Sequence, residues 1–273
     1  SYHYPFSRKN NPGGKPAAHD VPDFKDAPPG SYLTDLLAGE AVEFIEKSKE
    51  SPFLLLLAHY SVHTPIQARA RDITQYSERL EKLGLPRKVG IRPEKYGHTR
   101  TTQNNPAFAA MVASVDRSVG KVLGKLRELG LENETLVIFT SDNGGLSTLP
   151  GKRSAPTSCL PLRAGKGWLY EGGVRVPTIV SWPGITRPGS VSSVPVVTTD
   201  FYPTLLTAAG LPLRPAQHLD GVDLTPLLRG GALKQRALYW HYPHYHGSAN
   251  RPSASVRKGD YKLVRWYEDG SEE

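Results

Sequence analysis

Short hydrophobic runs alternate with stretches of helical periodicity along this chain, and the alternation predicts an α/β fold. Residues 53–60 and 135–140 are apolar runs with the length of strands buried on both faces, as in a helix-covered parallel sheet. Residues 176–182 predict a third strand, and 201–209 predict a short helix. We therefore expect a mostly parallel central sheet flanked by helices.

Two longer helices are predicted from apolar residues on one face. The first covers residues 31–49, with Ser31 as its N-cap. The second covers 106–129 and ends at Gly130. Its expected buried stripe consists of Val112, Val115, Val119, Val122, Leu123, Leu126 and Leu129. Residues 61–103 are rich in Arg, Lys, Gly and Pro, and we expect them to be irregular.

The pattern changes after Gly231. Residues 237–242 predict a strand, and 253–257 with 261–266 predict a hairpin joined through Lys258-Gly259-Asp260. We assign residues 1–230 to the α/β domain and 231–273 to the start of a small antiparallel subdomain.

Composition and charge narrow the class of protein. The chain has 273 residues, 34 Lys plus Arg against 26 Asp plus Glu, a net charge of +8 and one cysteine. One cysteine excludes an internal disulfide and a four-thiolate zinc site. The positive charge suggests anionic partners, but scattered basic residues and the absence of any zinc-finger spacing argue against nucleic acid. No apolar run approaches the roughly 18 residues of a membrane span, and the first residues do not form a signal peptide.

Polar residues follow two of the predicted strands, where ligands bind in open α/β sheets. The strand at 53–60 leads to His63-Thr64-Pro65, and the strand at 135–140 leads to Asp142-Asn143-Gly144-Gly145. A carboxylate beside an amide oxygen suits Ca²⁺ or Mg²⁺, although the same residues alone are typical of a turn. Lys166, between Gly165 and Gly167, suits an anionic oxygen, although an ordinary glycine-rich surface loop remains open.

Together and in this order, these segments resemble the sulfatase family, the formylglycine-dependent, arylsulfatase-like enzymes of the alkaline-phosphatase-like superfamily. The resemblance covers nearly the whole chain. The segments that carry it are His63-Thr64-Pro65, Leu136–Gly145, Leu162–Gly167, Glu171–Pro177, Asp200–Leu206 and Leu219–Leu224.

The resemblance implies a role for four residues. Asp142 and Asn143 correspond to ligands of the family's Ca²⁺ ion, for which Mg²⁺ is an alternative. Lys166 corresponds to a lysine that contacts the sulfate group. His63 corresponds to a histidine that binds a sulfate oxygen or protonates the leaving alkoxide, and an unperturbed histidine titrates near the range such an acid needs.

The family's nucleophile has no clear counterpart here. It is a formylglycine made from Cys or Ser in a C-x-P-S-R stretch, and it comes earlier than the residues above, together with two adjacent metal-binding aspartates. Cys159-Leu160-Pro161-Leu162-Arg163 fits a minimal C-x-P-x-R pattern. It follows the Asp142-Asn143 pair, however, and has Leu162 where the family has a small residue. We interpret Cys159 as an ordinary thiol and expect the nucleophile segment to precede residue 1.

A cluster of histidines and aromatic residues at 239–246 is the remaining candidate for a functional site. His241 and His244, with Arg251, are predicted to contact substrate at an aromatic rim. Packing of the small subdomain is the competing interpretation.

The resemblance implies a sulfatase that acts on a sulfated small molecule or glycan, in a secreted, periplasmic or lysosomal setting. Two alternatives stay open: a phosphoester or phosphonate hydrolase of the same superfamily, and a non-catalytic protein that binds sulfated glycans. Because the nucleophile segment is missing, we expect the 273 residues alone to be inactive.

Overall fold

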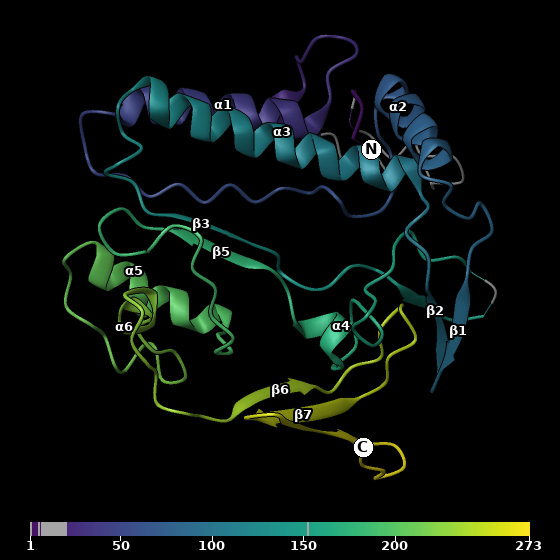
Figure 1. Ribbon diagram of the computed structural model, residues 1–273. Helices are drawn as coiled ribbons and strands as arrows, with labels where there is room; N and C mark the ends of the chain where they lie inside the picture. The colour runs from purple at the N-terminus through teal and green to yellow at the C-terminus, as the bar shows by residue number, and fades with distance from the viewer. Residues whose placement is uncertain (1, 5, 7–20, 152) are drawn as a thin grey trace. The chain divides into compact units, whose positions relative to one another are not determined.

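The chain forms two compact units in its computed structural model, which describes residues 2–4, 6, 21–151 and 153–273 (Figure 1). The first unit comprises Ser1–Ile91 and Arg100–Asn133, and the second comprises Arg92–Thr99 and Glu134–Glu273. The boundary that we predicted after residue 230, between the α/β domain and the small antiparallel subdomain, falls inside the second unit and stays a prediction.

Helices build the first unit. They are the 3₁₀ turn η2 (Pro22–Phe24) and the α-helices α1 (Leu33–Ser48), α2 (Ala70–Lys82) and α3 (Pro106–Glu128). Helix α3 packs against both α1 and α2 (Figure 1). Their core is formed by Tyr2, Phe6, Tyr32, Leu33, Ala68, Ala110 and Met111.

The two predicted long helices are confirmed, but the N-cap at Ser31 is wrong. Tyr32 precedes α1 without a side-chain cap, and Ser31 Oγ instead donates to the carbonyl of Pro28 at 2.7 Å. Helix α3 has the side-chain cap that α1 lacks: Asn105 Oδ1 accepts from the N–H of Phe108 at 3.2 Å. Pro106 suits the first turn of α3, where its missing N–H has no intrahelical partner.

The expected buried stripe of α3 is largely wrong. The helix buries Ala110, Met111, Ser114, Ser118 and Leu126, of which only Leu126 was predicted. Val112 and Leu123 of the predicted stripe are 47% and 38% exposed. Small side chains let the neighbouring helices approach closely, and the Ser114 hydroxyl is satisfied by donating to the Ala110 carbonyl at 3.0 Å. Packing, rather than hydrophobicity alone, therefore selected the face.

The interval 61–103 is not irregular throughout, as was predicted. It contains α2 and the strands β1 (Ile91–Glu94) and β2 (Gly97–Arg100). Ile73, Tyr76 and Leu80 carry a helical spacing that predicts α2 and that the charge-rich composition obscured. The helix is anchored by Asp72, which is buried and accepts from Arg117 of α3 at 2.5 Å.

The strand expected at 53–60 does not form a ladder. The segment runs without helix or strand assignment, and alternate side chains face solvent: Leu54 is 74% exposed and Leu56 is 87% exposed. The burial on both faces that we expected is therefore wrong, because one face of this segment is open to solvent. No second strand pairs with it among the described residues, so the hydrogen-bonded strand that we expected is wrong for this chain.

Strands dominate the second unit. It contains β3 (Val137–Thr140), β4 (Thr148–Leu149), β5 (Thr178–Ser181), β6 (Leu238–Tyr242), β7 (Ser253–Lys258) and β8 (Tyr261–Trp266). Short helices separate them: α4 (Glu171–Val174), η3 (Thr198–Asp200), α5 (Phe201–Ala208) and α6 (Thr225–Leu228). The predicted strands at 135–140 and 176–182, the short helix and the C-terminal hairpin are all confirmed.

The α/β class and the small antiparallel C-terminal sheet are confirmed. Strand β3 pairs with β5, β2 with β4, and β7 with both β6 and β8, and each of these pairs is antiparallel. The mostly parallel central sheet that we expected is not formed by the described strands. The segment at 53–60 forms no ladder, and β3 pairs antiparallel with β5. No described helix is both long enough and apolar enough to cross a membrane.

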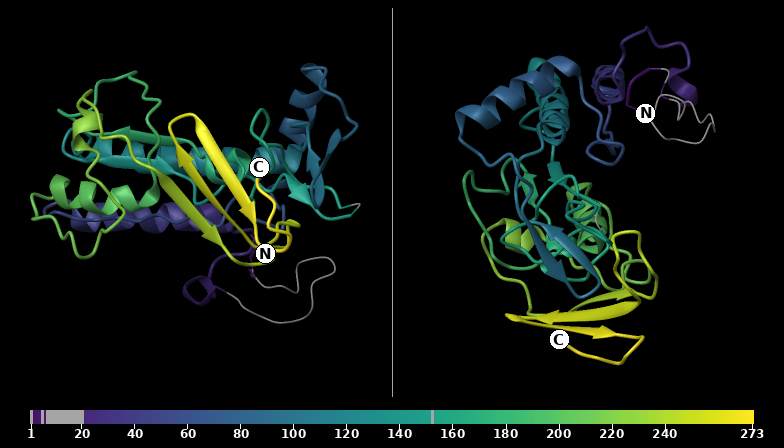
Figure 2. Two further views of the ribbon diagram at one scale, coloured as in Figure 1. Left: turned by 90° about the horizontal axis from the view of Figure 1, so that it is seen from below. Right: turned by 90° about the vertical axis from the view of Figure 1, so that its right-hand side faces the viewer.

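An aromatic core joins the C-terminal sheet to the Gly-Lys-Gly loop. Trp168 and Trp266 are each 1% exposed and meet edge to face at 6.0 Å between ring centroids. Ala164, Tyr170 and Val264 complete this buried cluster. The sheet of β6, β7 and β8, yellow in Figure 2, therefore shares a core with the loop that carries Lys166 through Val264 and Trp266 of β8.

Asp200 explains why the Asp200–Leu206 segment carries the family pattern. Its carboxylate is fully buried; it accepts the N–H groups of Val197 and Val222, both at 2.9 Å, and pairs with Arg236. The segment is therefore structural.

We expect Asp200→Ala to lower the free energy of unfolding by about 3 kcal/mol, because the half-buried Arg236 guanidinium and two N–H groups would lose their acceptor. Denaturant titration of the intact protein measures the change. Asp220→Asn, at an exposed position, is the control and should leave stability within about 0.5 kcal/mol. Equal stability of the two variants would contradict the structural role of Asp200.

Candidate active site

Asp142 and Asn143 lie directly after β3, where the backbone turns away from the β3–β5 pair. Asp142 is exposed and Asn143 is half-buried. Ser141 Oγ donates to the Asn143 carbonyl at 2.9 Å, which fixes the turn without using either side chain. Neither side chain has a hydrogen bond or ion pair within the described part of the chain, so both present oxygens to a ligand.

Three glycine-containing segments interlock beside this turn. Gly144 N–H donates to the Gly173 carbonyl at 2.9 Å, and Gly172 N–H donates to the Arg163 carbonyl at 2.8 Å. Cβ atoms would not fit: one at Gly144 would lie 1.8 Å from the Gly172 oxygen, and one at Gly165 would lie 2.3 Å from the Gly145 oxygen. Glycine is thus required here for close backbone approach.

Lys166 belongs to this interlocked scaffold. Its N–H donates to the Gly145 carbonyl at 2.9 Å, two residues after Asn143. Its side chain is half-buried, and no carboxylate forms an ion pair with its ammonium among the residues described. The structure therefore brings the sequence-predicted Asp142, Asn143 and Lys166 together on one rigid framework, with the cation available to bind an anion.

We expect Gly144→Ala to destabilise the intact protein by about 2–3 kcal/mol, because its methyl group would collide with backbone rather than with a movable side chain. Gly124→Ala, in the middle of α3 with nothing within 4 Å of the added Cβ, is the matched control. It should stabilise by about 0.5–1 kcal/mol. Thermal and denaturant unfolding of both variants measure the two changes in stability. Unchanged stability in Gly144→Ala would contradict the interlocked packing.

Cys159 packs against the same turn. Its Sγ donates to the Gly145 carbonyl at 3.3 Å. Burial raises the pKa of the thiol, and its hydrogen bonds with Ser147 and with the Gly145 carbonyl only partly offset this effect. A thiol with a raised pKa is a poor nucleophile at neutral pH, and the interpretation of Cys159 as an ordinary thiol stays a prediction.

His63 lies in the first unit, whereas Asp142, Asn143 and Lys166 lie in the second. The His63 side chain is exposed, and its Nδ1 lies 2.8 Å from the Thr64 carbonyl oxygen, to which only a protonated Nδ1 can donate. Tyr2 Oη donates to the His63 carbonyl at 2.9 Å and holds the turn. Nε2 is left as the nitrogen that can accept or deliver a proton.

The three remaining predicted residues lie at or after β6. His241 and His244 are exposed, and their rings contact Tyr267 and Tyr242 at 5.9 and 5.6 Å. Arg251 is paired with Glu268, and this hydrogen bond is the main cause of the raised pKa of Arg251. Since Glu268 already balances its charge, Arg251 is less suited to an anion than Lys166 is.

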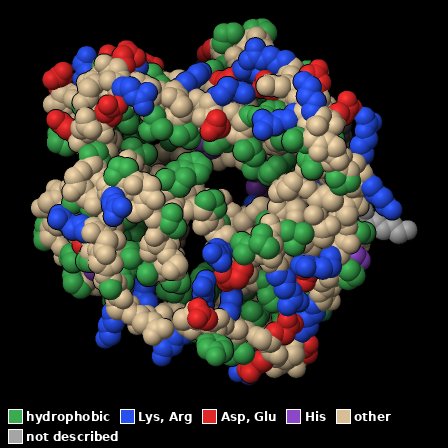
Figure 3. Space-filling model, in the orientation of Figure 1, with side chains coloured by type: hydrophobic (Ala, Val, Ile, Leu, Met, Phe, Trp, Pro, Cys, Tyr) green, Lys and Arg blue, Asp and Glu red, His purple; other side chains and the backbone are tan. Residues whose placement is uncertain are grey.

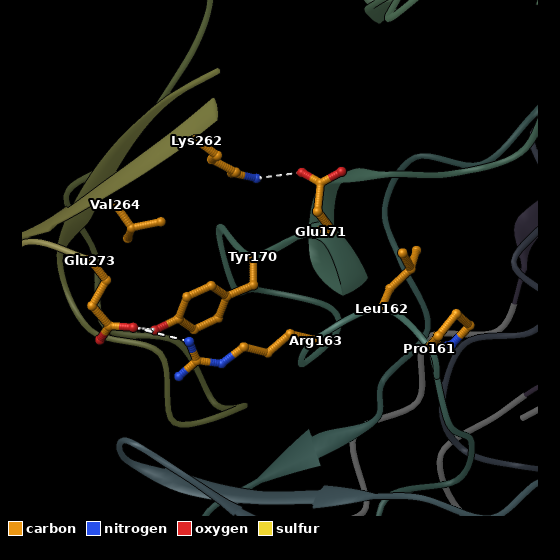
Figure 4. Close-up of a pocket in the computed structure, with 8 residues that line it drawn as sticks. All are labelled: Pro161, Leu162, Arg163, Tyr170, Glu171, Lys262, Val264 and Glu273. Carbon is orange, nitrogen blue, oxygen red and sulfur yellow. Dashed lines mark hydrogen bonds and ion pairs between the residues drawn. The ribbon is translucent and has the colours of Figure 1, made fainter. Parts of the chain in front are cut away.

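A pocket of about 340 Å³ lies near the C-terminal sheet (Figure 4). Its charged side chains point at one another: Lys262 pairs with Glu171 at 2.9 Å, and Arg163 pairs with Glu273 at 3.0 Å. Burial lowers the pKa of Lys262, and Glu171 partly offsets that shift. The pocket therefore offers no uncompensated charge to an anion. No pattern along the chain predicted this pocket.

Basic residues are not gathered into one patch on the face shown in Figure 3. There the Lys and Arg side chains are spread over several elements and lie among acidic ones. This view agrees with the scattered distribution along the sequence, which argued against a nucleic-acid-binding surface.

Asp142, Asn143 and Lys166 thus lie on interlocked loops of an α/β fold. The chain belongs to the sulfatase family: residues 2–211 match the family described as Sulfatase. Residues 164–273 match the family described as N-sulphoglucosamine sulphohydrolase, C-terminal.

Individual relatives agree. A sulfatase from Formosa agariphila is 36% identical over 261 residues, covering 88% of this chain and 43% of that protein. Human arylsulfatase A is 41% identical over 164 residues, covering 60% of this chain and 31% of that protein. The crystal structure of Ps i-CgsB in complex with k-i-k-neocarrahexaose has a TM-score of 0.69 at 31% identity, covering 89% of this chain and 48% of that one. The chain thus spans less than half the length of these relatives.

Membership of this family supports a metal cofactor. The described residues contain no group of three or more His, Cys, Asp or Glu side chains that could hold a metal ion. Asp142 and Asn143 nevertheless fit one, because their oxygens are hard donors without a protein partner in the part of the chain that the structure describes. They can supply two ligands of a larger shell.

Proposed function

We propose that the protein containing this chain hydrolyses sulfate esters of carbohydrates. The observation that carries the proposal is that Asp142, Asn143 and Lys166, whose ammonium has no ion pair among the described residues, belong to loops joined by backbone hydrogen bonds in one glycine scaffold. A sulfate ester bears negative charge on its transferring group, and fixed positive charge beside that group stabilises the transition state.

Asp142 and Asn143 are proposed to hold a Ca²⁺ ion, with Mg²⁺ as the alternative. When bound, the ion would neutralise charge on the sulfate oxygens. The carboxylate supplies the charge that attracts the cation, and the amide adds a neutral oxygen. The Gly144–Gly173 and Lys166–Gly145 backbone hydrogen bonds keep both side chains at a fixed distance from the lysine loop.

Lys166 is proposed to bind a sulfate oxygen directly. Because no carboxylate pairs with its ammonium in the described residues, binding an anion breaks no existing ion pair. An ordered loop also limits the conformational entropy lost on binding.

His63 is proposed to deliver a proton to the leaving alkoxide. The hydrogen bond from Nδ1 to the Thr64 carbonyl fixes the plane of its ring, so that Nε2 is the atom that holds the transferable proton. A neutral alcohol is a far better leaving group than its alkoxide, which makes such an acid useful for alkyl and sugar esters.

The nucleophile is proposed to be a formylglycine outside these 273 residues, since Cys159, the only cysteine here, follows the Asp142-Asn143 pair whereas the family's precursor precedes it. The proposed setting is a secreted, periplasmic or lysosomal compartment, as the family resemblance implies.

A sugar sulfate is the favoured substrate class for two reasons. The C-terminal residues match a family described by a sulphoglucosamine substrate, and Ps i-CgsB was solved with a neocarrahexaose. Exposed aromatic side chains on the C-terminal part of the chain, Tyr239, Tyr245 and Tyr267, suit the apolar faces of sugar rings.

Comparing turnover of matched esters by the intact protein tests the proposal. We expect release of sulfate from a sulfated sugar and from 4-nitrophenyl sulfate, and much slower release of phosphate from 4-nitrophenyl phosphate. Faster phosphate release would favour a phosphoester hydrolase. Binding of a sulfated polysaccharide without turnover, retained in Lys166→Ala and His63→Ala, would favour a non-catalytic glycan-binding protein.

A further inference from the structure

The loop that carries Lys166 lies directly against a second segment, His246–Ser248. Gly167 has a φ of +83°, and a Cβ there would lie 2.2 Å from His246 Nδ1 and 2.6 Å from Ser248 Oγ. The buried Trp168 donates from Nε1 to the Ser248 carbonyl at 2.9 Å. These contacts fix the His246 imidazole beside the loop immediately after Lys166.

Hydrogen bonds assign the proton on the His246 ring. The Ser248 N–H donates to His246 Nδ1 at 3.1 Å, and Ser248 Oγ lies 2.7 Å from the same nitrogen. A backbone N–H can only donate, so Nδ1 is an acceptor and the ring proton of the neutral imidazole is on Nε2. Burial, and then the neighbouring Lys166 charge, lower the pKa of His246, which favours this neutral form.

The Nε2–H donor of His246 has no acceptor among the described residues. The Tyr242 ring packs against the imidazole edge to face at 6.1 Å and offers no acceptor in that geometry. The His246 N–H and the Lys166 ammonium therefore lie on adjacent loops, and no carboxylate is paired with either among the described residues. Two such donors together suit an anionic oxygen.

We propose that His246 is a substrate-contacting residue whose Nε2–H donates a hydrogen bond to an oxygen of the sulfate group bound by Lys166. This inference rests on the proposed function and extends its site by one residue. His241 and His244, the histidines favoured by the sequence, are exposed on the tyrosine-rich side and have no contact with the Lys166 loop in the described structure.

Two variants of His246 test the proposal in the intact protein. His246→Ala removes the donor, and His246→Gln keeps an amide N–H that reaches nearly as far. We expect His246→Ala to weaken binding of inorganic sulfate and to raise KM for 4-nitrophenyl sulfate by about tenfold each. His246→Gln should recover both to within about threefold of the original protein. His98→Ala, at an exposed position on β2, is the control and should change neither.

Calorimetry with inorganic sulfate separates this inference from the proposed function. If the intact protein hydrolyses no sulfate ester but the affinities for sulfate follow the expected order, the function fails and the anion contact stands. If turnover occurs and His246→Ala matches the original protein in sulfate affinity and KM, the inference is overturned while the function stands. His246→Gln as weak as His246→Ala, with an unchanged thermal midpoint, would also overturn it.

Discussion

Lys166→Ala is expected to lower kcat/KM of the intact protein for a sulfate ester by about two to three orders of magnitude, because it removes a fixed cation from the transferring group. The loss should appear in kcat as well as in KM, since charge on the leaving oxygen and the sulfuryl group grows toward the transition state. The backbone hydrogen bond from Lys166 to Gly145 survives the substitution, so the loop should keep its conformation.

Steady-state kinetics with 4-nitrophenyl sulfate measure this effect. Lys166→Arg keeps the charge with a different shape and should lose less activity than Lys166→Ala. Lys121→Ala, at an exposed position on α3, is the control for loss of a positive charge alone. Full activity of Lys166→Ala would remove the central element of the proposed site.

Asp142→Ala is expected to weaken binding of Ca²⁺ to the intact protein by about a hundredfold or more, because it deletes a charged ligand that nothing else in the described chain replaces. Activity at limiting Ca²⁺ should fall in parallel and recover in part when excess Ca²⁺ is added. Asn143→Ala, which removes only a neutral oxygen, should have a smaller effect on the metal affinity.

Titration calorimetry with Ca²⁺ and with Mg²⁺ measures the affinities independently of turnover. Asp260→Ala, at the exposed tip of the β7–β8 hairpin, is the control for loss of one negative charge. Unchanged Ca²⁺ affinity in Asp142→Ala would assign the metal to other residues. It would also leave the turn after β3 with a purely structural role.

Local patterns predicted the secondary structure well where a segment has one clearly apolar face or one continuous apolar run. Helices α1 and α3, the β3 and β5 strands and the β7–β8 hairpin follow from periodicity and turn residues. Helix α2 was missed because charged residues hide the spacing of Ile73, Tyr76 and Leu80. The buried face of α3 was misassigned because close helix packing favours small residues such as Ala110 and Ser114 over valine.

The candidate site, too, was only partly predictable from the sequence. The sequence singled out Asp142, Asn143, Lys166 and His63 as residue types suited to a metal and an anion, and Cys159 as an ordinary thiol stays a prediction. It did not distinguish His246 from its neighbours, because three histidines within six residues look alike in a linear pattern. Only the contact of His246 with Gly167 separates it from them.

The sequence by itself therefore determined most of the local elements, α2 and the segment at 53–60 excepted, and which side chain types suit an anion, since both depend on residues close together in the chain. The tertiary structure decided which of those side chains meet. Gly144, Gly165 and Gly172 lack side chains and so allow distant backbone segments to approach within hydrogen-bonding distance. That approach places Lys166 beside Asp142 and Asn143, and no pattern along the chain contains this information.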